Sequence, residues 1–524
     1  MEQISAFIGG IGGYDAGKVN RLTKERFAPS MKENFIPADQ IHRLREQSWN
    51  LYRNNTHARK IVRTIETKVI GRGINPESQA TNADGSPHAK FRARAKKLWN
   101  DIQGGFDYRG MPGYGGIDFV SLQKSALRAV ILSGEALAQP RYIDGKEQRK
   151  RSLPVALTCQ LIDSNRLAEN IDIRYSNVLG SNEIYRGIEL NGDGRRVAYH
   201  LLNTPITYNF PTALETERIP ADKIIHLFTE EDIDQLRGVP WFAPAIMRQR
   251  DTSDYEYNEL KASALAACVA LWYRRPSGSN QTLGLNGSSD SDATDADGNA
   301  ITRLQPGLIM NLGKDGEAGG FNPARPSTNV EAFVQYLLRA TAAGFPGVKA
   351  STLTGDYRNS SFSSERSADN DAWPELVGLQ DWFAISFNQP LYDVLIDTAV
   401  TDGYFDGIVT PEEYNSRRAD FLRCAWQGPL GLSITPKDDA MAASLRIKTG
   451  ISSVQMECAK VNVDYRDMLK DIGAYCSEAE AAGVPKEVVF ATLGVTNSLE
   501  IQSELAPEQP QGAASNGKQA SNAA

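Results

Sequence analysis

The sequence predicts an α+β fold, and three observations lead to this prediction. Apolar residues recur at helical spacing through roughly the first 130 residues. Short apolar runs, separated by turn-forming residues, follow from about residue 134 to residue 228. Long helical patterns return after Pro240. Strands that are grouped between two helical regions, rather than alternating with helices, are typical of the α+β class.

Four helices are expected in the N-terminal region. Asp39 is placed to cap the first helix and Thr56 to cap the second, which Gly71 closes at the position after its end. Apolar residues at helical spacing mark two more helices, around 91–102 and 119–130. The buried faces of these helices are predicted to supply the core of an N-terminal domain.

Five strand-like segments follow these helices. They read ALAQPRY, VALTCQLI, EIYRGIEL, VAYHLL and KIIHLF. Turn sequences separate them, such as Asn191-Gly192-Asp193-Gly194. Together with the preceding helices, the strands predict one α+β domain over residues 1–239, which begins with an N-terminal arm.

Residues 240–275 are predicted to form one long helix. Pro240 suits the start of a helix, and the helical pattern is expected to run from there without a break to Tyr273. The first half of this stretch is charged and the second half is apolar nearly all round, so the second half must be buried. One chain offers too few neighbours for it, so we expect contacts between copies of the chain. The residues assigned to these contacts are Leu265, Val269 and Trp272.

Residues 276–327 are expected to form an insertion between two helices. The stretch PSGSNQTLGLNGSSDSDATDADGNA has almost nothing to bury and predicts a surface loop. Short strands are expected after it, in ITRL and GLIMNL. A second helix is predicted over residues 328–343.

A loop is predicted over residues 344–363. It is rich in Gly, Ser, Thr and Asn, and its only apolar anchors are Phe345, Val348 and Leu353. A long loop between two long helices is unusual in a compact domain and tends to be functional. We therefore expect this segment to carry part of the function.

A long helix is predicted after this loop. The sequence SSER at 363–366 has the form of a helix cap, and the amphipathic pattern continues to Val400. Pro390 predicts a kink or a break within this helix, because proline removes a backbone hydrogen bond.

Shorter helices are expected toward the C-terminus. Thr435 is placed to cap a helix that begins at Pro436, and Asp464 is placed to open another. Residues 504–524 have a low-complexity composition, which predicts a disordered tail.

Composition excludes several classes of protein. The five cysteines are odd in number and contain no CxxC pair, which indicates a reducing compartment without a disulfide framework or zinc site. The start, MEQISAFIGGIGG, does not have the form of a signal peptide. The longest apolar run, ASALAACVALWY, is shorter than the roughly 20 residues of a membrane span. We therefore expect a soluble protein without a membrane partner, made where it is used.

The search for catalytic and metal-binding motifs predicts no enzyme. GGYDAGKV at 12–19 approaches the phosphate-binding pattern GxxxxGK[ST], but Val19 replaces the hydroxyl residue that would contact a metal. DSDATDADGNA at 290–300 lacks the Gly and Glu of a calcium loop. The histidines show no metal-ligand spacing, and His226 is expected to be a hydrogen-bonded core residue. No cofactor and no metal are expected.

The loop segment also carries an ordered motif of mixed chemistry. Leu353-Thr354-Gly355-Asp356-Tyr357, Asn359, Ser361-Phe362-Ser363-Ser364 and Arg366 occur in this order. The motif resembles the LTGDY-x-N-x-S-(Y/F)-SS-x-R pattern of phage portal proteins of the lambda family, which form head-to-tail connector rings. SGEALAQPRY, LTCQLIDSNRL and IPADKIIHLFTEEDIDQLRGVPWFAPAI resemble further segments of that family. The resemblance covers roughly residues 14–475, with Thr435-Pro436 in place of the family's Asp-Pro.

The resemblance implies the portal fold, in which wing, stem, clip and crown regions form a closed homo-oligomeric ring around a central DNA channel. The implied assignment is 1–239 for the arm and wing, 240–275 for the first stem helix, 276–327 for the clip, 328–343 for the second stem helix, 344–363 for the channel loop, 364–430 for the long helix and wing, 431–503 for the crown and 504–524 for the tail.

The resemblance also implies a function. The protein would be a structural portal at one vertex of a phage capsid, part of the virion and assembled in the host cytoplasm. DNA would be packaged and ejected through the ring, which is expected to contain twelve copies. The implied partners are double-stranded DNA, the terminase large subunit, a head-completion or adaptor protein, and the major capsid and scaffold proteins. Two alternatives stay open: a nucleoside triphosphatase subunit of the packaging motor, and a tail or connector ring protein.

The channel loop would then face the DNA. The residues assigned to it are Lys349, Thr352, Thr354, Asp356, Tyr357, Arg358 and Asn359. Its two cations, Lys349 and Arg358, are few enough to touch phosphates without holding them, since each phosphate contact strengthens binding. The net charge of −7 agrees with a conduit, because a tight nucleic-acid binder would be strongly basic.

Overall fold

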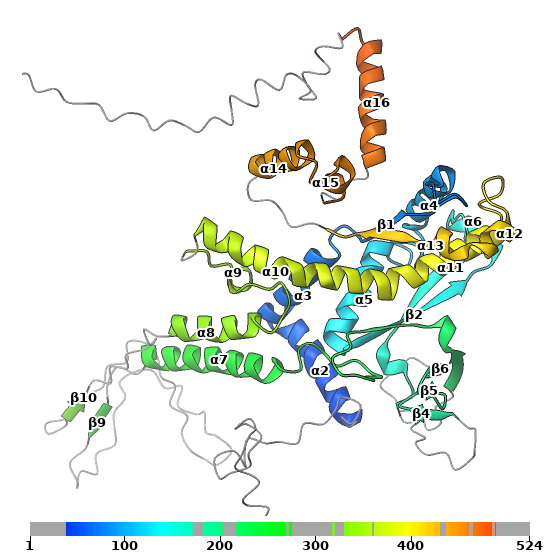
Figure 1. The fold of residues 1–524 in the computed structure, drawn as a ribbon. Helices are drawn as coiled ribbons and strands as arrows, with labels where there is room; N and C mark the ends of the chain where they lie inside the picture. The colour runs from blue at the N-terminus through cyan, green and yellow to red at the C-terminus, as the bar shows by residue number, and fades with distance from the viewer. Residues whose placement is uncertain are drawn as a thin grey trace, which may run out of the picture. The chain divides into compact units, whose positions relative to one another are not determined.

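The computed structural model describes residues 38–169, 171, 182–202, 216–268, 272–274, 317–319, 330–358, 361–429, 436–460, 465–484 and 488. The chain divides into two compact units, Met1–Ile434 and Thr435–Ala524, which are considered separately below. The first unit combines helices with antiparallel sheets (Figure 1), so the expected α+β class is confirmed.

The first described elements are helices, as expected. They are α2 (Ala38–Asn54), α3 (Thr56–Val69), α4 (Ala89–Ile102) and α5 (Phe119–Ser133). Two predicted caps are wrong: Asp39 lies inside α2, and α3 is capped by Asn55, whose side chain accepts a hydrogen bond from the backbone N–H of Ala58. Asn and Thr are both good cap residues, and the backbone turn between α2 and α3 decides between them. Gly71 has the left-handed φ of 54° that closes a helix.

Two antiparallel sheets follow. In the first, β2 (Glu135–Tyr142) pairs on either side with β3 (Leu157–Ile162) and β8 (Ile225–Phe228). The second sheet contains, in order, β4 (Glu183–Tyr185), β5 (Ile188–Leu190), β6 (Arg196–Leu202) and β7 (Thr216–Pro220). The five expected strand regions are confirmed, with EIYRGIEL divided into a hairpin, whereas β7 was not predicted. A short helix, α6 (Gly145–Lys150), lies between β2 and β3.

The main hydrophobic core joins the N-terminal helices to residues from much later in the chain. Phe91 on α4 lies against Phe405 and Phe421, with ring centroids 4.5 and 4.8 Å away. β1 (Asn75–Ser78) pairs with β11 (Cys424–Gln427). The core is therefore not closed within residues 1–239. It is completed by α10 (Phe362–Phe383), α11 (Gln389–Thr401), α12 (Pro411–Ser416) and α13 (Arg418–Leu422).

The single helix expected over 240–275 is shorter in the structure. Residues 241–245 form turns, and α7 spans Ile246–Cys268. Pro244 lies in these turns, and because it lacks a backbone N–H it delays the start of the helix beyond the expected Pro240. Trp272–Arg274 form a strand, β9, that pairs with β10 (Glu317–Gly319). An apolar run with aromatic residues fits a strand as well as a buried helix, and periodicity alone does not separate them.

A second helix lies beside α7, as expected for residues 328–343. It is α8 (Val330–Ala342), and Tyr255 of α7 contacts Phe333 of α8 with ring centroids 4.9 Å apart (Figure 1). After α8, the chain forms the short helix α9 (Ala350–Thr354) and then enters α10.

The predicted break at Pro390 is confirmed. The helical path from α10 changes to a π-helical turn at Ala384–Asn388, and α11 then begins with Pro390 in its first turn. A π-helical turn accommodates the missing proline N–H without ending the helical path. The start of α10 was placed two residues late, because Ser361 is the cap and forms reciprocal hydrogen bonds with Ser364.

The second unit contains three described helices. They are α14 (Pro436–Lys448), α15 (Val454–Lys460) and α16 (Tyr465–Ala481). Pro436 begins α14, as expected, and Gly450, two residues after its end, has a φ of 75°. Arg446 on α14 forms an ion pair with Glu457 on α15 at 2.8 Å, which ties the first two helices together. The predicted caps Thr435 and Asp464, and the tail 504–524, lie outside the described residues.

Candidate functional site

The loop between α8 and α10 is the first candidate site, and Lys349 is bound within it. The Nζ atom of Lys349 lies 2.6 Å from an oxygen of Glu365 and 2.9 Å from an oxygen of Asp369, both on α10. Burial lowers the pKa of Lys349, but the two carboxylates outweigh this effect and leave its pKa above the ordinary value. Lys349 therefore holds the loop against α10 as a permanent cation.

Arg358 is also paired. Its Nη2 atom lies 2.6 Å from Glu331 on α8 and 2.7 Å from Asp356. The hydrogen bonds that Arg358 donates lower the pKa of Asp356 to about 2. The Arg358 side chain is 72% exposed, so solvent screens these pairs and an external anion can compete for the guanidinium.

The remaining contacts pack the loop against its neighbours. Phe345, Val348 and Leu353 are buried, as expected of the anchors. Phe345 lies against Phe242, with ring centroids 4.6 Å apart. Lys68 of α3 donates a hydrogen bond of 2.9 Å to the carbonyl of Gly347. The loop is thus tied to α3, α10 and the turns before α7, and it contains a helix where an irregular segment was expected.

The structure brings several predicted loop residues to one surface. A shallow, open depression is lined by Gln335, Thr354, Gly355, Asp356, Tyr357 and Arg358. Thr352 lies half-buried on α9, and Asn359 lies outside the described residues. Contacts of this surface with DNA stay a prediction.

The residues predicted to join copies of the chain are only partly described. Leu265 lies within α7 and Trp272 within β9, while Val269 lies outside the described residues. Trp272 is therefore on a strand and not on the helix that it was expected to share with Leu265. Their contacts with other copies stay predictions.

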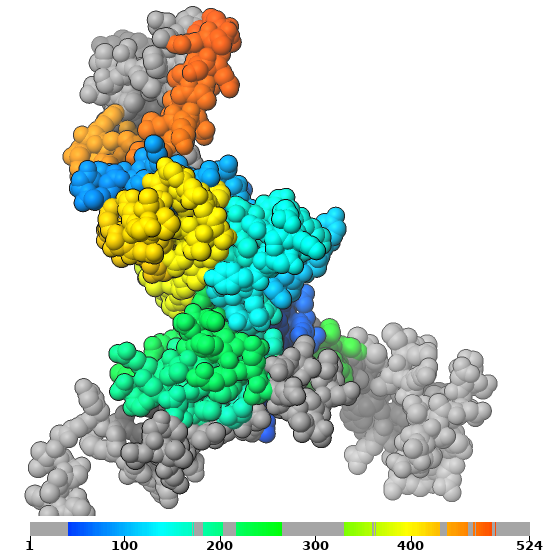
Figure 2. Space-filling model, turned by 90° about the vertical axis from the view of Figure 1, so that its right-hand side faces the viewer, coloured from blue at the N-terminus to red at the C-terminus, as the bar shows by residue number. Residues whose placement is uncertain are grey.

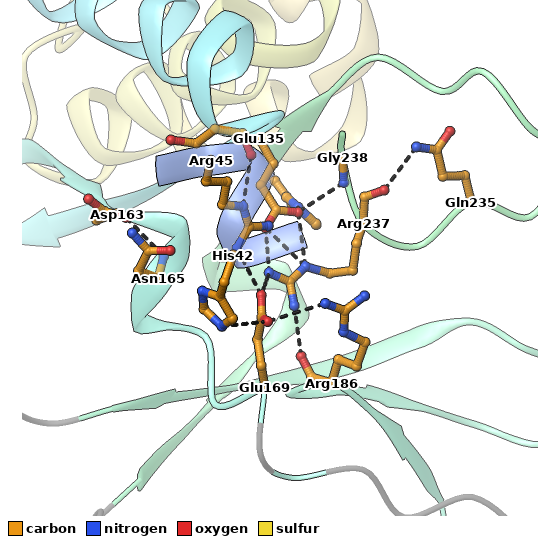
Figure 3. Close-up of polar contacts among 12 residues, drawn as sticks. His42, Arg45, Glu135, Asp163, Asn165, Glu169, Arg186, Gln235, Arg237 and Gly238 are labelled. Atoms are coloured by element: carbon orange, nitrogen blue, oxygen red, sulfur yellow. Dashed lines mark hydrogen bonds and ion pairs between the residues drawn. The ribbon is translucent and has the colours of Figure 1, made fainter. Parts of the chain in front are cut away.

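A second candidate site, not predicted from the sequence, is a buried cluster of charges in the first unit. It gathers side chains from α2, from the start of β2, from the segment after β3, from the β4–β5 turn, from β8 and from the segment that leads to α7. The cluster residues are His42, Arg45, Glu135, Glu169, Arg186, His226 and Arg237, most of which are labelled in Figure 3.

Glu135 is the centre of this cluster and is fully buried. Its carboxylate accepts hydrogen bonds from Arg45 Nη2 at 2.8 Å and from Arg237 Nε at 2.9 Å. The backbone N–H of Gly238 and the ring of His226 each lie 3.1 Å from its Oε2 atom. Every side of the carboxylate is thus occupied by the chain itself.

Glu169 is the second carboxylate. It lies 2.8 Å from Arg45, 2.7 Å from Arg237 and 3.2 Å from Arg186. His42, which is partly exposed, approaches its other oxygen at 3.0 Å. The two carboxylates and three guanidinium groups therefore share their hydrogen bonds, and Arg45 and Arg237 bridge both acids (Figure 3).

The ionisation of the cluster follows from this geometry. Burial raises the pKa of Glu135, but Arg237 and Arg45 overcome the burial and hold this pKa well below the ordinary value. Burial also raises the pKa of Glu169, and His42, Arg237 and Arg45 lower it more strongly. The pKa of His226 falls because the ring is buried, against the attraction of Glu135. Both carboxylates are thus ionised at neutral pH and His226 is neutral, with its other ring nitrogen 3.3 Å from the Tyr199 hydroxyl.

Two glycines bring the backbones of this region together. Gly134, between α5 and β2, has a φ of 87°, and a Cβ atom there would lie 2.6 Å from the carbonyl carbon of Gly238. A Cβ atom on Gly238 would lie 2.1 Å from the carbonyl oxygen of Gly134. Only glycine permits this approach, which places Glu135 and Arg237, the residues beside the two glycines, within hydrogen-bond distance.

The cluster unites segments that the sequence had singled out for another reason. Three segments resemble segments of a known family: GEA at 134–136, LTCQLIDSNRL, and RGVP at 237–240. Each of them contains a cluster residue or lies next to one. The one sign of this cluster in the sequence was Glu135, a charged residue within the apolar pattern SGEALA. Neither its partners nor their number could be read from the sequence, because they come from distant segments.

The described part of the chain shows no further site of catalytic type. It contains no group of three or more His, Cys, Asp or Glu residues that could hold a metal ion. Among the same residues, no helix is long and apolar enough to cross a membrane.

Comparison with known proteins identifies the family. The family described as "Phage portal protein, lambda family" matches residues 20–380. The chain is 23% identical to Portal protein B of Escherichia phage lambda over 340 residues, which are 61% of this chain and 62% of that protein. It is 21% identical to the portal protein of Escherichia phage N15 over 463 residues, 83% of this chain and 84% of that protein. The chain belongs to the lambda family of phage portal proteins, as its loop motif predicted.

Solved structures with a similar chain include chains of gene transfer agent (GTA) particles. One is the neck of an empty GTA particle computed with C6 symmetry, at a TM-score of 0.42 and 12% identity, covering 84% of this chain and 98% of that chain. Another is the neck of a native GTA particle computed with C12 symmetry, at a TM-score of 0.39 and 11% identity, covering 78% of this chain and 90% of that chain.

Proposed function

We propose that this protein is the subunit of a closed ring, expected to contain twelve copies, at one vertex of a phage capsid. DNA would be packaged and ejected through the ring, and the terminase large subunit and a head-completion protein would dock on it. The observation that carries the proposal is the family match over residues 20–380, which includes α7, α8, the loop and most of α10. We assign α7 and α8 to the stem, the loop 344–363 to the channel and residues 431–503, which include α14, α15 and α16, to the crown.

Imaging of the purified full-length protein tests the ring. We expect particles with rotational symmetry and an open centre when they are viewed down the axis. The substitution Leu265→Glu should reduce the fraction of protein in rings, because burying an unpaired charge in an apolar contact costs several kcal/mol. A protein that stays monomeric at micromolar concentration would contradict the proposal.

The loop contacts suggest different roles for the two cations that were expected to touch phosphates. Lys349 is 15% exposed and held by two carboxylates, whereas Arg358 is exposed. We therefore expect Arg358→Ala to permit ring assembly and to lower the yield of packaged DNA, since it removes the cation that can reach a phosphate.

Lys349→Ala should instead lower the melting temperature, because Glu365 and Asp369 lose their shared partner. The measurements are DNA protection in a packaging reaction and thermal unfolding. A structure of the ring with residues 352–358 on the outer rim would exclude this role of the loop.

We expect no nucleotide hydrolysis from the purified ring. The alternative function as a motor nucleoside triphosphatase depends on Gly12, Gly17 and Lys18, which lie outside the described residues and precede the matched region. An ATPase assay with magnesium should give the rate of the buffer alone. Turnover that is abolished by Lys18→Ala would establish the alternative.

A further inference from the structure

The end of the first unit at which α6 lies carries a basic segment. Residues 141–150, at the end of β2 and in α6, contain Arg141, Lys146, Arg149 and Lys150. Lys146 and Arg149 are exposed, and neither forms an ion pair with any residue that the structure describes. Of the two acids in this segment, Asp144 caps α6, and Glu147 pairs with Arg151 at 2.8 Å and with Lys150 at 3.8 Å. The unbalanced charge on this surface is therefore positive.

An acidic segment lies next to it. Residues 402–416 read DGYFDGIVTPEEYNS and contain no Lys or Arg. Their four acids are all exposed, and they are Asp402, Asp406, Glu412 and Glu413. Two cations of the described residues lie against this segment: Arg417 is 3.9 Å from Glu413, and Arg94 lies over the Tyr404 ring at 4.3 Å, so the four acids outnumber them. The unbalanced charge here is negative.

Both segments are anchored by contacts that do not use the charges of Lys146, Arg149, Glu412 or Glu413. Arg151, at the end of α6, donates hydrogen bonds to the carbonyls of Asp107 at 2.6 Å and Tyr108 at 3.1 Å. α12 is capped by Thr410, and the buried Tyr414 donates a hydrogen bond of 2.7 Å to Asp397. Charged groups on a rigid support lose little conformational entropy when they meet a partner.

The two segments are neighbours and lie in adjacent lobes of the first unit. Ala156 links them: its carbonyl accepts a hydrogen bond of 3.0 Å from the N–H of Ile143 in the basic segment, and its N–H donates one of 3.4 Å to Asp402 in the acidic segment. Figure 2 views this end of the unit, with the acidic segment in the yellow lobe on the left and the basic segment in the cyan lobe on the right. One flank is thus acidic and the other is basic.

Exposed tyrosines accompany the basic segment. Tyr114 is 83% exposed, Tyr142 is 69% exposed and Tyr108 is 41% exposed. Arg141 lies over the Tyr108 ring at 5.7 Å. Tyr114 stands in a loop that the Asp107 carboxylate closes by accepting a hydrogen bond of 3.0 Å from the N–H of Ile117. Tyrosine and arginine are enriched at the centres of protein–protein interfaces.

We propose that the basic flank of one copy docks on the acidic flank of the next copy, so that each subunit contributes both halves of the contact. This inference rests on the proposed ring. A ring with rotational symmetry uses two different, complementary surfaces on every subunit, and opposite charges on two flanks meet this requirement. A second copy fits better than duplex DNA, because the acidic segment next to the basic one would repel phosphates.

Charge reversal tests the contact in the full-length protein. Arg149→Glu with Lys150→Glu makes the basic flank acidic, and Glu412→Lys with Glu413→Lys makes the acidic flank basic. We expect each double variant to assemble about tenfold more weakly at low salt, since attraction between exposed charges is replaced by repulsion. The variant with all four changes should regain rings, because the charges are complementary again. Mass photometry at several protein and salt concentrations measures the fraction in rings.

A control variant, Arg195→Glu with Lys223→Glu, makes the same charge change at exposed positions away from these flanks and should assemble like wild type. Unchanged melting temperatures show that the monomers are folded. If wild type forms no rings, the proposed function fails. If wild type forms rings and the double variants assemble normally, only the docking inference fails. The same holds if the variant with all four changes loses more ring assembly than either double variant. Lower binding of a fluorescent DNA duplex by the Arg149/Lys150 variant, with ring formation unaffected, would also overturn it.

Discussion

Glu135→Gln should destabilise the first unit by about 3–5 kcal/mol, the largest effect that we expect from one side-chain change. Glutamine keeps the size of the side chain but removes the negative charge that neutralises Arg45 and Arg237. Both guanidinium groups are buried, so they would lose one of their two carboxylate partners where water cannot replace it. Urea denaturation followed by tryptophan fluorescence measures the loss.

A matched control is Glu331→Gln, which removes the same charge from the ion pair with Arg358. That pair is exposed, so no measurable loss of stability is expected. Arg237→Met alone should also be harmful, whereas Arg237→Met together with Glu135→Gln should cost less than the sum of the two. Additive losses would show that the two side chains are not coupled.

The same cluster predicts the response of stability to pH. The folded pKa of Glu135 lies well below its ordinary value of 4.5, and that of His226 lies below 6.5. A folded pKa below the unfolded pKa contributes stability that is present above the unfolded value and is lost as the pH falls. Wild type should therefore lose stability from about pH 6.5 downward, and more steeply below about 4.5. Glu135→Gln should flatten the steeper part of this profile.

Gly238→Ala should be comparably harmful for a purely steric reason. The added methyl group would lie 2.1 Å from the carbonyl oxygen of Gly134 and 2.8 Å from Cβ of Phe228. A backbone atom cannot rotate away as a side chain can, so the segment before α7 must separate from the α5–β2 turn. That movement would pull Arg237 from Glu135. We expect a loss of at least about 3 kcal/mol, or insoluble protein.

Gly192→Ala is the corresponding control, because a Cβ atom at Gly192 would meet nothing within 4 Å. Its melting temperature should match that of wild type. A Gly238→Ala protein with unchanged stability would mean that the segments before α7 and after α5 separate without cost. In that case the cluster would not set the position of α7.

Local patterns in the sequence were sufficient for most elements of the fold. Helical periodicity and proline chemistry predicted α4, α5, the break near Pro390 and the start of α14, because these features depend on neighbours within a few residues. The same patterns gave wrong predictions where two local structures are nearly equal in energy. Asn55 and Thr56 are both suitable caps, and the apolar run around Trp272 suits either a helix or a strand.

The sequence by itself determined the class of fold, the family and the place of the loop, since a motif of a dozen positions carries that information without any contact being known. Only the tertiary structure decided which charges meet. Lys349 and Arg358, expected to be open to phosphates, are held by carboxylates from α10 and α8. Glu135, which looked like one charge in an apolar strand, is the centre of a cluster whose members come from positions 42 to 237. The physical reason is that a buried charge is tolerated only beside its partners, and those partners are neighbours in space and not in the chain.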